Sequence, residues 1–170
     1  MADNNGVRRR VFSVLMDDEP GALARVAGVL TGRGYNIDGL TVARIPRLNS
    51  EDQRLARMTI VVLASDTMAV QVAAQMQRMV NTHTVEDLTD NPHRVEAEIT
   101  LIKLVTSSDA KQRAAIQMAE SGFRAKAILV EAEFVIFDHR GFKDSARAFA
   151  KAMSRYGEIE VACSGPVAIA

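Results

Sequence analysis

The stretch VFSVLMDDEPGALARVAGVLTG (residues 11–32) contains the elements that decide the fold. Apart from Ser13, residues 11–16 are apolar, aromatic or β-branched, and they are too few for a helix, so they predict a strand. The acidic turn Asp17–Gly21 ends that strand. Beyond it the apolar residues follow the i, i+3, i+4, i+7 spacing of an amphipathic helix at Leu23, Val26, Ala27 and Leu30. Glycines at 32 and 34 are typical of a helix end.

The rest of the first half continues this pattern. It predicts strands over about 35–45, 55–64 and 85–88, a polar loop over 46–53, and a second helix with Ala69, Val72, Met76, Met79 and Val80 on its apolar face. Ser65 or Asp66 is the expected N-cap of that helix. The order β-α-β-β-α-β is the split βαβ pattern of ferredoxin-like domains. Asp90-Asn91-Pro92 then reads as a boundary, because Asn-Pro breaks both helix and strand.

The second half repeats the pattern less clearly. It predicts strands over 99–105, 125–130, 134–137 and 159–162, a helix capped by Ser107 or Ser108 that ends near Gly122, and a helix that ends at Gly157. We therefore expect an α+β protein of two ferredoxin-like βαββαβ domains, over residues 8–90 and 93–170.

Composition narrows the classes of protein. Apolar residues make up 48% of the 170, enough for a core, and 21 Lys and Arg balance 21 Asp and Glu. With no net charge, the chain has no long-range electrostatic attraction to nucleic acid or to an anionic membrane. The single cysteine, Cys163, excludes an internal disulfide. The N-terminus has no signal-peptide pattern, and no apolar run approaches the ~20 residues of a membrane helix. We expect a cytoplasmic protein without nucleic-acid or membrane partners.

A βαββαβ unit hosts unrelated functions, so the site must be argued from side chains. RNA binding is disfavoured because the two strands that would stack bases carry one aromatic residue, Phe12. A metal carrier needs clustered ligands, whereas the histidines at 83, 93 and 139 are scattered and Cys163 is alone. A small phosphatase of this topology would need cationic and amide donors in the loop after its first strand. This loop carries three acidic residues instead, which would repel a phosphate. No Ser-His or Cys-His spacing suggests a nucleophile, although a spatial pair stays open.

A small amino-acid sensor fits the turn better. A helix N-terminus offers unpaired N–H donors and partial positive charge to a carboxylate, and Gly21 leaves the N–H groups of residues 21–23 unshielded. Asp18 offers an acceptor to an ammonium. Asn36, which starts the second strand, is expected beside the start of the first helix, where its amide would donate and accept. Each residue also has an ordinary reading as a turn former.

Five segments resemble the small subunits of acetolactate synthase, also called acetohydroxyacid synthase: residues 13–23 (SVLMDDEPGAL), 33–43 (RGYNIDGLTVA), 57–60 (RMTI), 98–103 (EITLIK) and 160–165 (EVACSG). The resemblance extends from Arg9 to the end and is most specific in RGYNI-x-x-LTVA. It implies that the first domain is an ACT domain whose effector, usually valine, binds between two such domains. The effector residues that match are Asp18, Gly21, Ala22, Leu23 and Asn36.

The chain departs from the family at two positions. Asp18 stands where Asn is common, which brings a charge near the effector carboxylate and puts affinity and effector choice in doubt. Cys163 stands where Arg is usual, which puts the contacts of the second domain in doubt. We do not expect valine binding to depend on this second departure.

The resemblance also implies a non-enzymatic regulatory subunit that forms a homodimer. It would activate a catalytic subunit carrying thiamine diphosphate, FAD and magnesium, and valine or a related amino acid would reverse the activation. The loop 44–57, with Arg44, Arg47, Arg54 and Arg57, would then be part of the partner-facing surface or simply a solvated loop. The alternative is a stand-alone ACT sensor acting on another enzyme or on a transcription factor.

Overall fold

The computed structural model describes residues 6–32, 34–45 and 54–170. The chain divides into two compact units, Met1–Val95 with Pro166–Ala170, and Glu96–Gly165. No helix in the described part of the chain is long and apolar enough to cross a membrane.

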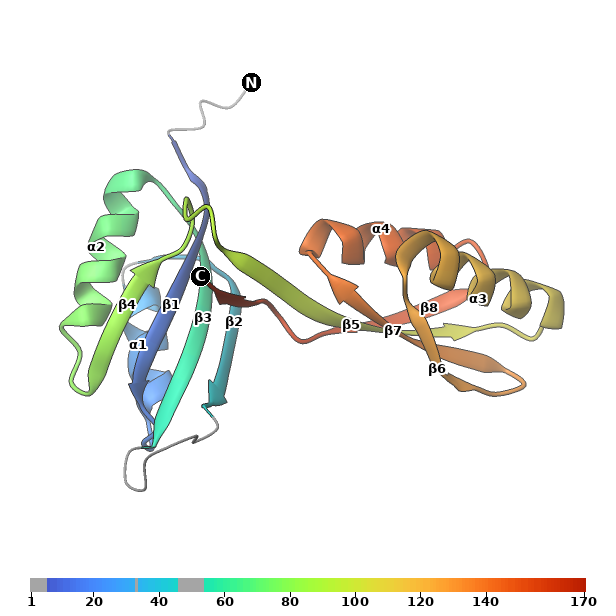
Figure 1. Ribbon diagram of the computed structural model, residues 1–170, viewed down its shortest axis with the longest axis horizontal. Helices are drawn as coiled ribbons and strands as arrows, with labels where there is room; N and C mark the ends of the chain where they lie inside the picture. Colours follow the sequence, from blue (N-terminus) through green and yellow to red (C-terminus); the bar gives the residue numbers. More distant parts are fainter. Residues whose placement is uncertain (1–5, 33, 46–53) are drawn as a thin grey trace. The chain divides into compact units, whose positions relative to one another are not determined.

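The first unit is a four-stranded antiparallel sheet with two helices (Figure 1). Its elements in chain order are β1 (Arg8–Asp17), α1 (Ala22–Thr31), β2 (Ile37–Arg44), β3 (Leu55–Ala64), α2 (Asp66–Gln77) and β4 (Thr82–Asp87). The strand order is β2-β3-β1-β4. Because β1 and β2 each pair antiparallel with β3, they run in the same direction. The order β-α-β-β-α-β predicted from the sequence is confirmed, and Ser65 caps α2 as one of the two expected residues.

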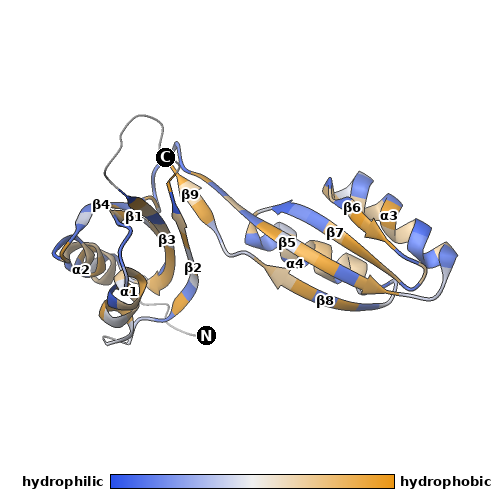
Figure 2. Cartoon of the chain, turned by 90° about the horizontal axis from the view of Figure 1, so that it is seen from below, coloured by the Kyte–Doolittle hydropathy of each residue, from blue (hydrophilic) through white to orange (hydrophobic). Residues whose placement is uncertain are grey.

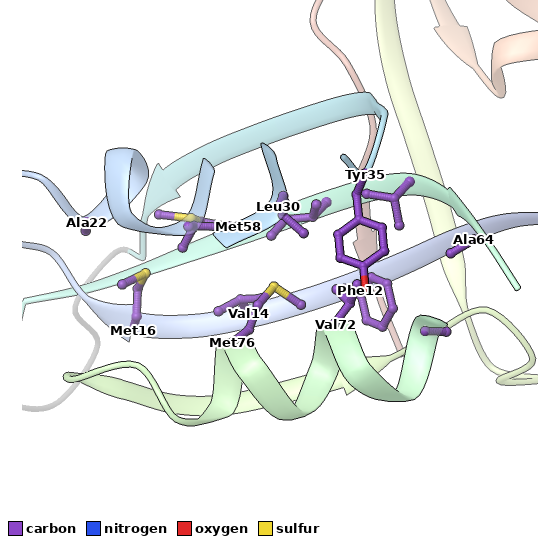
Figure 3. Close-up of a cluster of buried hydrophobic side chains, with 14 residues drawn as sticks. Phe12, Val14, Met16, Ala22, Leu30, Tyr35, Met58, Ala64, Val72 and Met76 are labelled. Carbon is purple, nitrogen blue, oxygen red and sulfur yellow. The ribbon is translucent and has the colours of Figure 1, made fainter. Parts of the chain in front are cut away.

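One face of this sheet and both helices enclose the core. Phe12, Val14 and Met16 alternate along β1 on that face, and Figure 3 shows them meeting side chains of α1 and α2. Leu30 and Met76 bring the two helices into the same cluster. β3 is mostly hydrophobic in Figure 2, because both of its faces are covered over much of its length. β1 is therefore an inner strand of the sheet, and the acidic turn follows directly at its end.

The second unit has the same topology. Its elements are β5 (Val95–Val105), α3 (Asp109–Phe123), β6 (Lys126–Val130), β7 (Phe134–Gly141), α4 (Lys143–Met153) and β8 (Glu158–Cys163), in the order β6-β7-β5-β8. Ser108 caps α3. Phe137, Phe149 and Met153 lie at the centre of its core. The second copy of the pattern is therefore confirmed, with β5 and β7 longer than the sequence predicts.

The chain ends differently from the expected second domain, 93–170. A short strand, β9 (Val167–Ile169), follows β8, and residues Pro166–Ala170 belong to the first unit. There Ala168 is buried with Val11 and Val61, and its N–H donates to Thr59 Oγ1 at 3.1 Å. Three residues are too few to show a periodicity, so β9 could not be predicted from the residue pattern.

Gly157 provides a test of the second unit's packing. A Cβ at this position would lie 2.2 Å from the Val105 carbonyl oxygen, a backbone atom that cannot turn aside. Gly157→Ala is therefore expected to lower the free energy of unfolding by about 1–3 kcal/mol in urea denaturation. Gly28→Ala is the matched control, because this exposed helical glycine has no neighbour within 4 Å of the added atom, and the change should stabilise by up to about 1 kcal/mol. Equal stability of Gly157→Ala and the unmodified chain would contradict this packing.

Candidate functional site

The site is the turn that leaves β1 and enters α1. Gly21 is the N-cap of α1 and has φ +83°, a left-handed conformation that glycine adopts without strain. Two backbone hydrogen bonds hold the turn in place. The Asp18 N–H donates to the Arg54 carbonyl at 2.7 Å, and the Asp17 N–H donates to the Asn81 carbonyl at 2.9 Å. The start of the helix is thus fixed to β3 and to the residues before β4.

Each of the three consecutive acids of this turn has its own basic partner, from three different elements. Asp18 pairs with Arg44 at the end of β2, and Glu19 pairs with Arg25 of α1. His83 of β4 places Nε2 2.8 Å from Asp17 Oδ1. The turn is acidic in sequence, but Arg44 and Arg25 offset the charges of Asp18 and Glu19, and His83 shares a hydrogen bond with Asp17. A ligand carboxylate can therefore approach it without meeting three bare negative charges.

The free backbone donors differ slightly from those expected. The Ala22 N–H donates to the Glu19 carbonyl at 3.2 Å, so it is not available to a ligand, and the Ala22 side chain is buried in the core. The N–H groups of Gly21, Leu23 and Ala24 have no acceptor within the described chain. These donors and the helix dipole suit a carboxylate. Leu23, which is 42% exposed, follows Ala22 at the start of the helix and offers an apolar contact.

Asn36 does not lie beside this turn in the same chain, contrary to the expectation. It directly precedes β2, whose first residue, Ile37, pairs with Val62, which in turn pairs with Arg10 near the start of β1. Asn36 is therefore at the opposite end of the sheet, about 25 Å from the turn at ~3.4 Å per strand residue. The reason is that α1 must run back along the sheet before β2 can begin.

The arginines of the 44–57 segment have specific contacts where they are described. Arg57 donates to Ser13 Oγ at 2.8 Å across β1 and β3. Arg44 and Arg54, with Ile45 and Leu55, line a cavity of about 330 Å³. Pro46–Gln53, which includes Arg47, lies outside the described residues. Sequence reasoning did not find the roles of Arg44, Arg25 and His83 as partners of the turn.

Other candidate chemistry is sparse in the part of the chain that the structure describes. No group of three or more His, Cys, Asp or Glu side chains is placed to hold a metal ion there. Cys163 is exposed at the end of β8, with its Sγ 3.8 Å from Thr100 Oγ1. His139 is buried between Phe123 and Phe149 and contacts Ser145 Oγ at 3.0 Å. These residues belong to the second unit and do not contribute to the turn.

Comparison with known proteins gives a consistent result over nearly the whole chain. A family model described as an AHAS small subunit-like ACT domain matches residues 12–84, and one described as the small subunit of acetolactate synthase matches residues 97–170. The acetolactate synthase small subunit of Aquifex aeolicus is 35% identical over 96% of this chain and 81% of its own length. The probable small subunit of Archaeoglobus fulgidus is 35% identical over 95% and 96%.

A solved structure extends the similarity to three dimensions. The crystal structure of the acetolactate synthase small subunit from Thermotoga maritima matches with a TM-score of 0.80 and 31% identity. The match covers 95% of this chain and 96% of that one. Both βαββαβ units are thus included in one match.

Proposed function

The chain belongs to the family of acetolactate synthase small subunits, whose role is regulatory, and we propose that it activates a catalytic subunit and makes it sensitive to valine or another branched-chain amino acid. The observation that carries the effector part is the turn at the start of α1. It combines free N–H donors, a neutralised acidic side chain at Asp18, and the exposed Leu23. A free α-amino acid needs a site for its carboxylate beside a site for its ammonium, and a branched one needs apolar contact.

We propose that a second copy of the chain completes this site with its Asn36. β2 is one of the two edge strands of its sheet, and Val42 on it is 43% exposed. Such an edge can pair with another copy, and a two-fold axis requires antiparallel pairing of identical strands. Antiparallel pairing sets the start of β2 in one copy beside its end in the other. Asn36 of one copy would then lie next to Arg44 and the turn of its partner.

The catalytic chemistry is proposed to belong to the partner subunit, which would hold thiamine diphosphate, FAD and magnesium in the cytoplasm. In this scheme valine acts by binding two states of the assembled complex with different affinity, because a ligand shifts an equilibrium only by that difference. The segment 44–57 is a proposed part of the surface that contacts the catalytic subunit. The effector site at Asp18 and the surface that contacts the catalytic subunit would then adjoin at the end of β2.

Two measurements test the proposal. Titration calorimetry of the purified chain with valine, leucine and isoleucine should give saturable binding of at least one of them. In an acetolactate-formation assay the chain alone should produce none, should raise the rate of a catalytic subunit, and should lose that effect when the bound amino acid is added. Acetolactate formation by the chain alone, or absence of binding to all three amino acids, would contradict it.

A further inference from the structure

We propose that Arg44 is a specificity-determining residue of the effector site, which makes the site prefer a zwitterionic amino acid over an amine that lacks the carboxylate. This inference rests on the effector site proposed above. It concerns the charge that a ligand must carry, and it comes from the contact between Arg44 and Asp18.

The two side chains of this ion pair differ in how far they are exposed to solvent. The Asp18 side chain is only 22% exposed, whereas the Arg44 side chain is 75% exposed at the end of the edge strand. The pair is made through Asp18 Oδ2, an atom that is shielded from solvent. Arg44 therefore pairs by charge, without a hydrogen bond, with one carboxylate oxygen and leaves the other as the acceptor for a ligand ammonium. Arg44 also lines the cavity that it shares with Arg54.

Charge balance then decides which ligand is favoured. An ionised Asp18 without Arg44 would present a full negative charge, which attracts an ammonium and repels a carboxylate placed at the start of α1. With Arg44 in place the pair is close to neutral, and the carboxylate can bind the free N–H groups of Leu23 and Ala24. Removal of Arg44 must shift preference toward a ligand with net positive charge, whatever it does to absolute affinity.

The test compares L-valine with L-valinamide, which keeps the ammonium and the side chain but has no carboxylate. Calorimetry of the full chain at about pH 6.5, below the ordinary pKa of an α-amino group, gives the ratio of the two dissociation constants. We expect Arg44→Ala to lower the ratio of the valinamide Kd to the valine Kd by about tenfold at low salt, as for one charge some 6 Å away at a protein surface. The effect should shrink at high salt.

Asp18→Asn supplies the opposite change, because it removes the negative charge and leaves Arg44. It should raise the same ratio, and the double variant Asp18→Asn/Arg44→Ala should return it close to the original value. A merely structural role of Arg44 would leave the ratio unchanged in Arg44→Ala. Arg147→Ala, which removes an exposed charge from α4 in the other unit, is the control and should change nothing.

The outcomes separate the two proposals. If the unmodified chain binds valine and the ratio is the same after Arg44→Ala, the role of Arg44 is wrong and the effector site stands. A fall in the ratio that Asp18→Asn does not reverse would also overturn it, since Arg44 would then act independently of Asp18. If the unmodified chain binds none of the branched-chain amino acids, the effector site fails, and this inference fails with it.

Discussion

Gly21→Asp is expected to abolish inhibition by valine while activation of the catalytic subunit is retained. The new carboxylate would lie at the start of α1, beside the N–H groups proposed for the effector carboxylate, and would repel that group. A carboxylate this close should weaken valine binding on the order of a hundredfold or more.

The fold should survive this change. A Cβ on Gly21 meets only Arg25 Nη1, at an ordinary 3.7 Å, and Asp tolerates a left-handed conformation better than most residues. Gly6→Asp is a matched control, since Gly6 has φ +67° and nothing within 4 Å of an added Cβ. Calorimetry with valine and the acetolactate assay provide the measurements. Valine sensitivity that persists in Gly21→Asp would remove the turn from the effector site.

The sequence predicted the fold well because its strongest signals are local. β3 was placed at its observed bounds, Leu55–Ala64, by a run of β-branched residues, and α1 was placed by one apolar stripe. The caps Ser65 and Ser108 followed from their position before a helix. The predictions that failed concern which residues lie close together in space. Asn36, at the start of the second strand, was predicted beside the start of α1, but α1 runs back along the sheet and carries the chain to its other end.

The charge balance of the turn could not be predicted for the same reason. Three acids in succession indicate that basic partners are needed, but the chain has 21 Lys and Arg and the sequence does not say which ones. Arg44 and His83 meet the turn only because β2 ends and β4 begins at the same end of the sheet as β1 ends. The charge at Asp18, which from sequence alone seemed unfavourable to an effector carboxylate, is offset by that register.

Mixed dimers should show that two copies share each effector site. If the turn of one copy and Asn36 of the other form a site, homodimers of Gly21→Asp and of Asn36→Ala each have two damaged sites and should not respond to valine. A dimer with one chain of each kind should keep one intact effector site. One of its sites carries both changes, whereas the other combines the intact turn of the Asn36→Ala chain with the intact Asn36 of the Gly21→Asp chain.

Two affinity tags on a co-expressed pair allow the mixed dimer to be purified and titrated with valine. We expect one valine site per mixed dimer with a Kd close to that of the unmodified protein, and about half of the valine inhibition in the acetolactate assay. A site built within one chain predicts the opposite, because each chain of the mixed dimer would carry one change and no intact site would exist. The roughly 25 Å between Asn36 and the turn within one chain is the physical reason to expect restoration, because a single amino acid cannot reach both ends of β2.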